Sequence, residues 1–115
     1  MAYDEDLADR VRALLGGESR VSEQRMFGGL AFLIGGNMGV AVSGRGGILV
    51  RVVPDEADDL IASGPAEPAV MGGRRMRGWV VVGKDDLRDD GALSPWIARG
   101  AAYARSLPPK ERGRR

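Results

Sequence analysis

Apolar runs separated by glycine-rich turns fill residues 25–53 of this 115-residue chain. The turns are Gly35-Gly36-Asn37 and Ser43-Gly44-Arg45-Gly46-Gly47. Apolar runs of strand length joined by such turns are typical of an antiparallel meander. We therefore predict three strands here, the first from Met26 to Ile34, after a polar approach over residues 18–25. The three predicted strands cover residues 26–34, 38–42 and 48–53.

Both faces of this predicted sheet are poor in charge. Even-numbered residues of the first strand are the bulkier set and are expected to face helices, while Ala31 and Leu33 point to the other side. Arg51 is the one charged residue in the third strand. A sheet with one face in water usually alternates apolar and polar residues more cleanly. We expect another helix or a second subunit to cover the second face, which predicts a homodimer.

Helices are predicted on both sides of the meander. Leu7, Val11 and Leu14 form one apolar stripe in a helix over residues 4–15. Pro54 ends the third strand and starts a short acidic helix over residues 55–62.

The last part of the chain predicts a second hairpin and a final helix. The hairpin joins residues 69–71 to residues 75–82, and residues 83–91 form a charged loop. Ser94-Pro95 is a strong helix start, and small residues in the middle of that helix permit close approach to a sheet. We predict one α+β domain over residues 1–107, with terminal helices packed on an antiparallel sheet, and a basic, disordered tail over residues 108–115.

The composition excludes many kinds of chemistry. The chain has no cysteine and no histidine, so thiolate sites, histidine ligands and Ser-His-Asp triads are absent. Carboxylates remain as Mg²⁺ ligands. They cluster in residues 55–59 and 85–90, which read more simply as solvated faces. We expect no catalytic, cofactor-binding or metal-binding residues, and no enzymatic activity. A small-ligand or Mg²⁺-dependent enzyme built on these carboxylates is the second alternative function.

The location is predicted from the N-terminus and the apolar runs. The acidic start, Asp4-Glu5-Asp6, does not fit a secretory signal. The run Leu30–Ile34 is far shorter than the ~20 residues that a membrane-spanning helix needs. A cytoplasmic protein is therefore expected. The richness in Ala, Gly and Arg, with Lys84 and Lys110 as the only lysines, favours a GC-rich bacterial genome.

One arginine-rich run is the candidate interaction surface: Arg74, Arg75, Arg77 and Trp79. On a strand, Arg75, Arg77 and Trp79 would share a face, which can stack on bases or contact phosphates. Together with the basic tail, it makes a nucleic-acid accessory protein the alternative function. The formal net charge of +1 favours a solvated hairpin instead. The glycines at 44–47 favour a hairpin turn over a phosphate-binding loop, because a strand follows them and a helix does not.

The motif Arg25-Met26-Phe27-Gly28-Gly29, followed by an apolar strand, a glycine turn and Met38, resembles the TfoX N-terminal domain family. These bacterial proteins are named for a regulator of competence for DNA uptake. The order of the later elements also fits the family over roughly residues 5–107. Gly78-Trp79-Val80 departs from it, because the family tends to have tyrosines there.

The resemblance implies a compact α+β fold similar to secretion chaperones, which often dimerise. It carries over no catalytic residue, so Arg25, Met26, Phe27, Gly28 and Gly29 are expected to be mainly structural. It also implies a stand-alone version of the domain, with a regulatory or protein-interaction role linked to competence or transcription.

Overall fold

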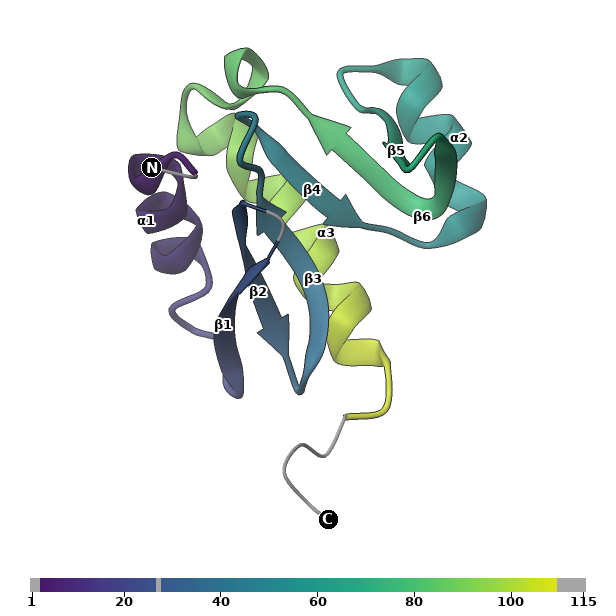
Figure 1. Cartoon of the computed structure of the whole chain (residues 1–115). Coiled ribbons are helices and arrows are strands. Elements are labelled where there is room, and N and C mark those ends of the chain that lie inside the picture. Colours follow the sequence, from purple (N-terminus) through teal and green to yellow (C-terminus); the bar gives the residue numbers. More distant parts are fainter. Residues whose placement is uncertain (1–2, 27, 110–115) are drawn as a thin grey trace.

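The computed structural model describes residues 3–26 and 28–109, in which helices pack on one six-stranded antiparallel sheet (Figure 1). In space the strands lie in the order β1-β2-β3-β4-β6-β5. The predicted α+β class, an antiparallel sheet with terminal helices packed on it, is confirmed. The elements are α1 (Glu5–Leu14), β1 (Val21–Met26), β2 (Gly29–Ile34), β3 (Asn37–Val42), β4 (Ile48–Arg51), α2 (Pro54–Ser63), β5 (Glu67–Met71), β6 (Arg74–Val82), the short 3₁₀ helix η1 (Lys84–Leu87) and α3 (Asp90–Ser106).

The predicted first strand, Met26–Ile34, is confirmed over β2 (Gly29–Ile34), but its start is wrong, because the chain reverses between Met26 and Gly29. Met26 ends β1 and pairs with Gly29 at the start of β2. Gly28 has φ +76°, a conformation that glycine adopts without steric cost. The polar approach over residues 18–25 contains most of β1. As an edge strand β1 exposes polar side chains to water, which hides its strand character in the sequence.

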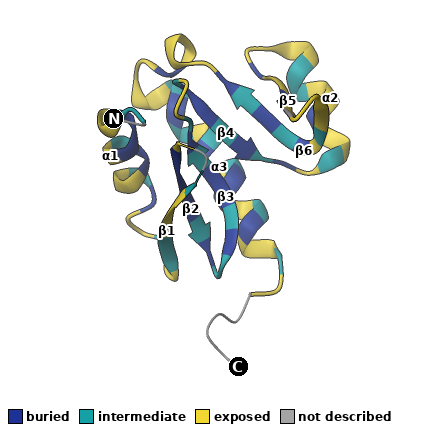
Figure 2. Ribbon diagram, in the orientation of Figure 1, coloured by how far each residue is buried: buried dark blue, intermediate teal, exposed yellow. Residues whose placement is uncertain are grey.

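The core lies between the sheet and the helices. Leu7 and Val11 of α1 and Ile97 of α3 pack with alternate residues of the central strands, such as Phe32 and Val50. These side chains are almost fully removed from water. Figure 2 shows this burial along the sheet, whereas most of the outer surface of α2 is exposed. The predicted stripe of α1 is thus the stripe that packs into the core.

Both early helices begin close to their predicted positions. The Leu7 N–H donates to Asp4 Oδ1 at 3.0 Å, so the Asp4 side chain caps α1. Pro54 is the first residue of α2, as predicted. The buried Ala57 turns toward the core on the inner side of α2.

The start of α3 differs from the prediction. The helix begins at Asp90, and the Asp89 side chain caps it by accepting from the Ala92 N–H. Pro95 therefore lies inside the helix and Ser94 is not its cap. The longer helix buries Leu93 completely, which offsets the hydrogen bond that proline cannot donate. The predicted loop 83–91 consequently contains η1 and the first residues of α3.

Small residues allow α3 to cross close to β3, as the sequence predicts. A Cβ atom added to Gly100 would lie 2.5 Å from the Gly39 carbonyl oxygen and 2.7 Å from a Val40 methyl carbon. No side chain fits into these distances, so the backbones of helix and strand pack directly against each other.

The second face of the sheet carries apolar side chains that are half-buried, including Leu33, Ala41 and Leu49. In Figure 1, α3 passes behind β3 and β4, and within the described residues no helix crosses the front of β2, β3 and β4. The described helices therefore do not supply the predicted cover. A second subunit on this face stays a prediction.

The segment that follows α3 is hydrogen-bonded to the sheet at Pro108. The buried Asn37 side chain donates through Nδ2 to the Pro108 carbonyl oxygen at 2.9 Å. This bond fixes the chain after α3 against the β2–β3 turn, so the predicted tail does not start as a free segment at residue 108. Residues 110–115, which hold its basic residues, lie outside the described residues. None of the described helices is both long and apolar enough to cross a membrane.

Candidate functional site

Two arginines of the predicted interaction surface are paired with carboxylates. Arg75 of β6 donates to Asp58 of α2 at 2.6 Å, and Arg77 lies 3.6 Å from Asp55 of the same helix. Arg74 is exposed in the same strand. Exposed ion pairs of this kind contribute little stability, but they reduce the positive potential of the run. The role of this run in binding stays a prediction.

Trp79, the fourth residue of that surface, interacts with a different arginine. Arg51 of β4 is its direct cross-strand partner, and the guanidinium carbon lies 5.3 Å from the Trp79 ring centroid. The same guanidinium lies 5.3 Å from the ring of Tyr103 on α3. Two aromatic rings therefore hold one cation, which is favourable because each ring face is electron-rich.

An open groove of about 510 Å³ lies next to this cluster, between α3 and the start of α2. Val53 and Glu56 form one wall, and residues of α3 from Pro95 to Ser106 form the other. Its lining is mainly apolar, and Val53 is 40% exposed although it is large and hydrophobic. Exposed apolar surface in a concave site is typical of a binding surface.

Arg99 is the arginine that lines the groove, whereas Arg51 lies beside it against Tyr103. The Arg99 guanidinium carbon lies 5.4 Å from the Trp96 ring centroid. Its Nε is buried without a hydrogen-bond partner among the described residues. An unsatisfied buried donor is uncommon in folded proteins and favours a missing acceptor.

The third half-buried arginine of the described chain, Arg10, has a carboxylate partner, unlike Arg51 and Arg99. Arg10 donates to Asp90 at 3.0 Å. Within the described residues, Arg51 and Arg99 have no carboxylate within ion-pair distance. Arg51, Arg99 and Tyr103 are therefore a cationic, aromatic cluster whose charge the described chain does not neutralise.

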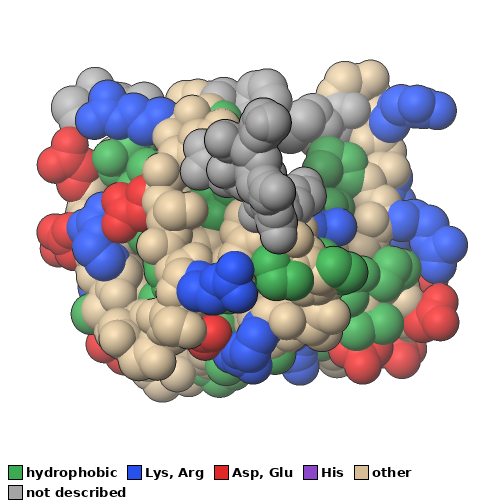
Figure 3. Space-filling model, turned by 90° about the horizontal axis from the view of Figure 1, so that it is seen from below, with side chains coloured by type: hydrophobic (Ala, Val, Ile, Leu, Met, Phe, Trp, Pro, Cys, Tyr) green, Lys and Arg blue, Asp and Glu red, His purple; other side chains and the backbone are tan. Residues whose placement is uncertain are grey.

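The face seen from below in Figure 3 shows how charges are distributed on one side of the molecule. Basic and acidic side chains are interspersed there, and hydrophobic side chains lie between them. On this face, the described residues do not form one large basic patch of the kind that nucleic-acid binding favours.

The family motif and the second glycine-rich turn are both built into hairpins. Arg25 and Met26 end β1, and Gly28 and Gly29 form the reversal into β2, while Phe27 lies outside the described residues. In residues 43–47, the Ser43 N–H donates to the Gly47 carbonyl at 3.0 Å, and β4 follows. This turn connects two strands, so it lacks the helix N-terminus of a phosphate-binding loop.

Carboxyl groups with shifted pKa values belong to structural contacts. A hydrogen bond from Arg105 lowers the pKa of Glu18, and one from Arg12 lowers the pKa of Glu23. The backbone N–H of Leu7 lowers the pKa of Asp4. Each shift comes from pairing, which stabilises the charged form, and none makes a neutral acid for proton transfer. In the described part of the chain, no three carboxylates come together as metal ligands.

Sequence reasoning missed Arg99 and Tyr103, which line the groove, and Arg51, which contacts Tyr103. Arg51 carried one signal, a lone charge inside an apolar strand. Arg99 and Tyr103 carried none, because only the crossing of α3 over the sheet brings them next to β4 and α2.

Comparison with known protein families identifies the family of this chain. The model of the TfoX N-terminal domain matches residues 13–104. Comparisons with curated proteins and with solved structures found no match. The matched residues run from the end of α1 to the last turns of α3 and include the whole sheet and all groove residues except Ser106. On this match, the chain belongs to the TfoX N-terminal domain family.

Proposed function

We propose that this chain is a non-enzymatic, cytoplasmic regulatory domain that binds a protein partner through the groove between α2 and α3. The observation that carries the proposal is an apolar groove beside two half-buried arginines that have no carboxylate partner within residues 3–26 and 28–109. Family membership supports a regulatory role, with competence or transcription control as its context.

The chemistry of the groove favours an acidic, apolar segment of the partner. Apolar side chains of that segment would cover Val53, Ala98 and Ala102, which gains free energy because water leaves these surfaces. A carboxylate would then accept hydrogen bonds from Arg51 or Arg99. Such charge-assisted bonds are stronger than neutral ones and fix the orientation of the segment. Glu56 at the opposite wall disfavours a segment with acids along its whole length.

The test uses a substitution that fills the groove without touching the core. Ala102 is exposed on α3, so Ala102→Glu adds bulk and negative charge to the groove and leaves the packing intact. Ala13→Glu adds the same side chain at an exposed position of α1 and serves as the matched control. Chemical cross-linking in cells, followed by mass spectrometry, identifies the partners of each variant.

We expect the control to keep the partner of the parent chain and Ala102→Glu to lose it. Retention of that partner by Ala102→Glu would exclude the groove as the binding surface. Turnover of a defined substrate that disappears on changing one polar residue would overturn the non-enzymatic part of the proposal.

Nucleic-acid binding is the competing function. It predicts salt-sensitive binding of DNA or RNA that weakens in the Arg75→Ala/Arg77→Ala double variant. The ion pairs of these arginines with α2 argue against it. If the parent and the double variant bind DNA or RNA equally and the binding does not change with salt concentration, nucleic-acid binding through these arginines is excluded.

Self-association is proposed for the second face of the sheet, on which Arg51 and Trp79 lie next to Leu49 and Val81. Leu33, Leu49 and Val81 lie half-buried on that face, and pairing with a second copy would bury them further. Sedimentation velocity over a range of concentrations tests this, with Leu49→Lys as the disrupting variant. A single monomeric species at the highest concentration would exclude a dimer.

A further inference from the structure

The two edges of the sheet differ in how well they are protected from pairing with another strand. At one edge, β5 contains Pro68, which has no N–H to donate, and its register against β6 shifts between Pro68 and Val70. Proline and such irregularities protect an edge strand. At the other edge, β1 pairs with β2 over six consecutive residues without a register shift and contains no proline. Within the described residues no strand lies on the outer side of β1, which therefore remains open to a further strand (Figure 1).

The backbone groups that β1 presents at this edge follow from its pairing with β2. The Gly35 N–H donates to the Arg20 carbonyl oxygen at 3.1 Å, so these two residues form a hydrogen-bonded pair in the register of β1 and β2. Hydrogen-bonded and non-hydrogen-bonded pairs alternate along an antiparallel ladder. The even-numbered residues of β1 therefore bond to β2, whereas the N–H and C=O groups of Val21, Glu23 and Arg25 point outward. These are the donors and acceptors that an added strand would use.

The side chains of β1 place two opposite charges on one face and a neutral amide on the other. Arg12 of α1 donates to Glu23 at 2.9 Å, and Arg25 lies on the same face because side chains two positions apart in a strand point the same way. Arg25 is exposed and has no carboxylate within ion-pair distance among the described residues. Gln24 is exposed on the opposite face.

We propose that β1 pairs antiparallel with β1 of a second copy of this chain, so that the two sheets become one. Only residues with outward backbone groups can bond across this edge, so odd-numbered residues meet odd-numbered residues. Of the registers that meet this condition, one alone places Glu23 opposite Arg25 of the second copy. Opposite charges face each other twice in it, because the pairing is twofold symmetric. Gln24 of each copy then meets its own counterpart on the twofold axis, where one amide can donate to the other.

The charge pattern favours a second copy over an unrelated strand, because β1 is complementary to itself. The contact consists of one pair of strands, so it is smaller than the interfaces of stable complexes, and we expect a Kd on the order of 10–100 μM. The β1 edge is separate from the groove and from the second face of the sheet. The pairing therefore does not rest on the function proposed above.

Disulfide cross-linking tests the register, because the chain has no cysteine of its own. In the proposed register the Cα atoms of residue 24 in the two copies form a non-hydrogen-bonded pair about 4.5 Å apart, which is within reach of a disulfide. Residues 22 of the two copies lie four positions apart along the strands, about 13 Å, which is too far. We expect Gln24→Cys to form a covalent dimer under mild oxidation at least tenfold faster than Ser22→Cys, measured by non-reducing gel electrophoresis. Equal rates would overturn the proposed register.

Charge reversal tests the pairing itself by sedimentation velocity. The measurement is made in a Leu49→Lys background, which removes association through the second face. Arg25→Glu sets like charges opposite each other and should weaken association at least tenfold. Arg45→Glu makes the same change of charge in the exposed turn between β3 and β4, so it is the control and should associate as its parent does.

Three results would overturn the pairing through β1. The first is a Leu49→Lys chain that stays monomeric at concentrations well above the expected Kd. The second is equal association of Arg25→Glu and Arg45→Glu, with circular dichroism to show that both are folded. The third is loss of the Gln24→Cys cross-link when Leu49→Lys is added, because the contact would then depend on the face of the sheet and not on its edge.

Discussion

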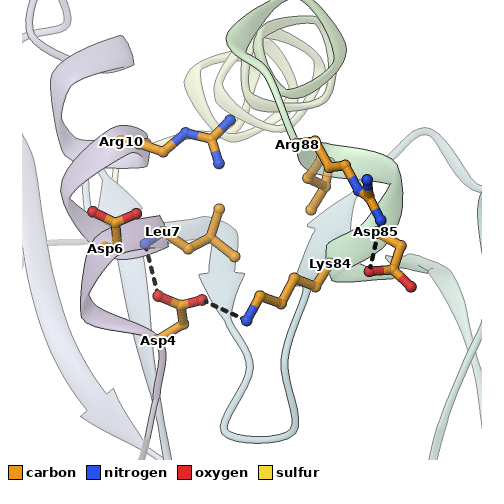
Figure 4. A pocket seen from close by; sticks show the side chains of 8 residues that line it. Asp4, Asp6, Leu7, Arg10, Lys84, Asp85 and Arg88 are labelled. Carbon is orange, nitrogen blue, oxygen red and sulfur yellow. Dashed lines mark hydrogen bonds and ion pairs between the residues drawn. The ribbon is translucent and has the colours of Figure 1, made fainter.

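The groove along α3 and the α1–η1 cleft, a cavity of about 210 Å³ lined by residues such as Asp4, Arg10 and Lys84 (Figure 4), expose different kinds of side chain. The groove is mainly apolar, and its arginines are held by aromatic rings. The cleft is mainly polar, and its side chains are tied into ion pairs that connect α1 to η1 and α3. Groove residues are therefore free to serve a partner, whereas cleft residues also hold the fold together.

α3 lines the groove, and its first residue, Asp90, pairs with Arg10 of the cleft. The close packing of α3 on β3 should therefore be the point most sensitive to substitution. We predict that Gly100→Ala destabilises the fold by about 2–3 kcal/mol, because the added methyl would clash with the Gly39 backbone and a Val40 methyl. Urea denaturation measures this loss. Gly17→Ala is the control, since nothing lies within 4 Å of its added methyl. A loss from Gly100→Ala no larger than the control's would contradict the close packing of α3.

Among the residues that line the cleft, Asp4 is expected to contribute to the stability of the fold. Removing its cap and its contact with Lys84 by Asp4→Ala should lower the free energy of unfolding by about 1 kcal/mol. Asp9→Ala, which removes an exposed partner of Arg12 on the same helix, should cost less than about 0.5 kcal/mol. Equal losses in thermal denaturation would mean that the cleft has no special structural role.

The groove side should tolerate changes that abolish binding. Arg51→Gln removes the cation between Trp79 and Tyr103, which should cost about 0.5–1 kcal/mol. Arg45→Gln, in an exposed turn, is the control and should change nothing measurable. If Arg51→Gln lowered the free energy of unfolding by more than Asp4→Ala does, the groove side would contribute more to stability than the cleft side, contrary to the prediction.

The smallest expected effect concerns pH, and it involves neither region. Arg105 lowers the pKa of Glu18 in the folded state, so the pair stabilises the fold at neutral pH. This contribution is present above the unfolded pKa of Glu18 and is lost as the pH falls through the lower, folded value. We predict a fall in the urea midpoint between pH 5 and pH 3 that is smaller in Glu18→Gln.

Arg105→Gln should reduce that pH dependence to the same extent, and the double variant should add nothing further. Additive effects of the two substitutions would mean that the pair does not cause the pH dependence.

Much of the fold follows from local sequence. The stripe of Leu7 and Val11, proline at the start of α2, and the glycine-rich turns each encode an element through short-range sterics and periodicity. The prediction was wrong where local signals compete. A strand at the sheet edge looks like a polar loop, and Ser94-Pro95 looks like a helix start although Asp89 caps the helix earlier.

The sequence by itself determined the α+β class, most of the elements, the family motif and the absence of histidine and cysteine chemistry. The tertiary structure alone decided where charge meets apolar surface. Arg51, Trp79 and Tyr103 come together because β4 pairs with β6 and α3 crosses the sheet. Lys84 pairs with Asp4 because η1 lies next to α1. Such contacts depend on the packing of elements that are distant in the chain, and local patterns of apolar and polar residues do not specify them.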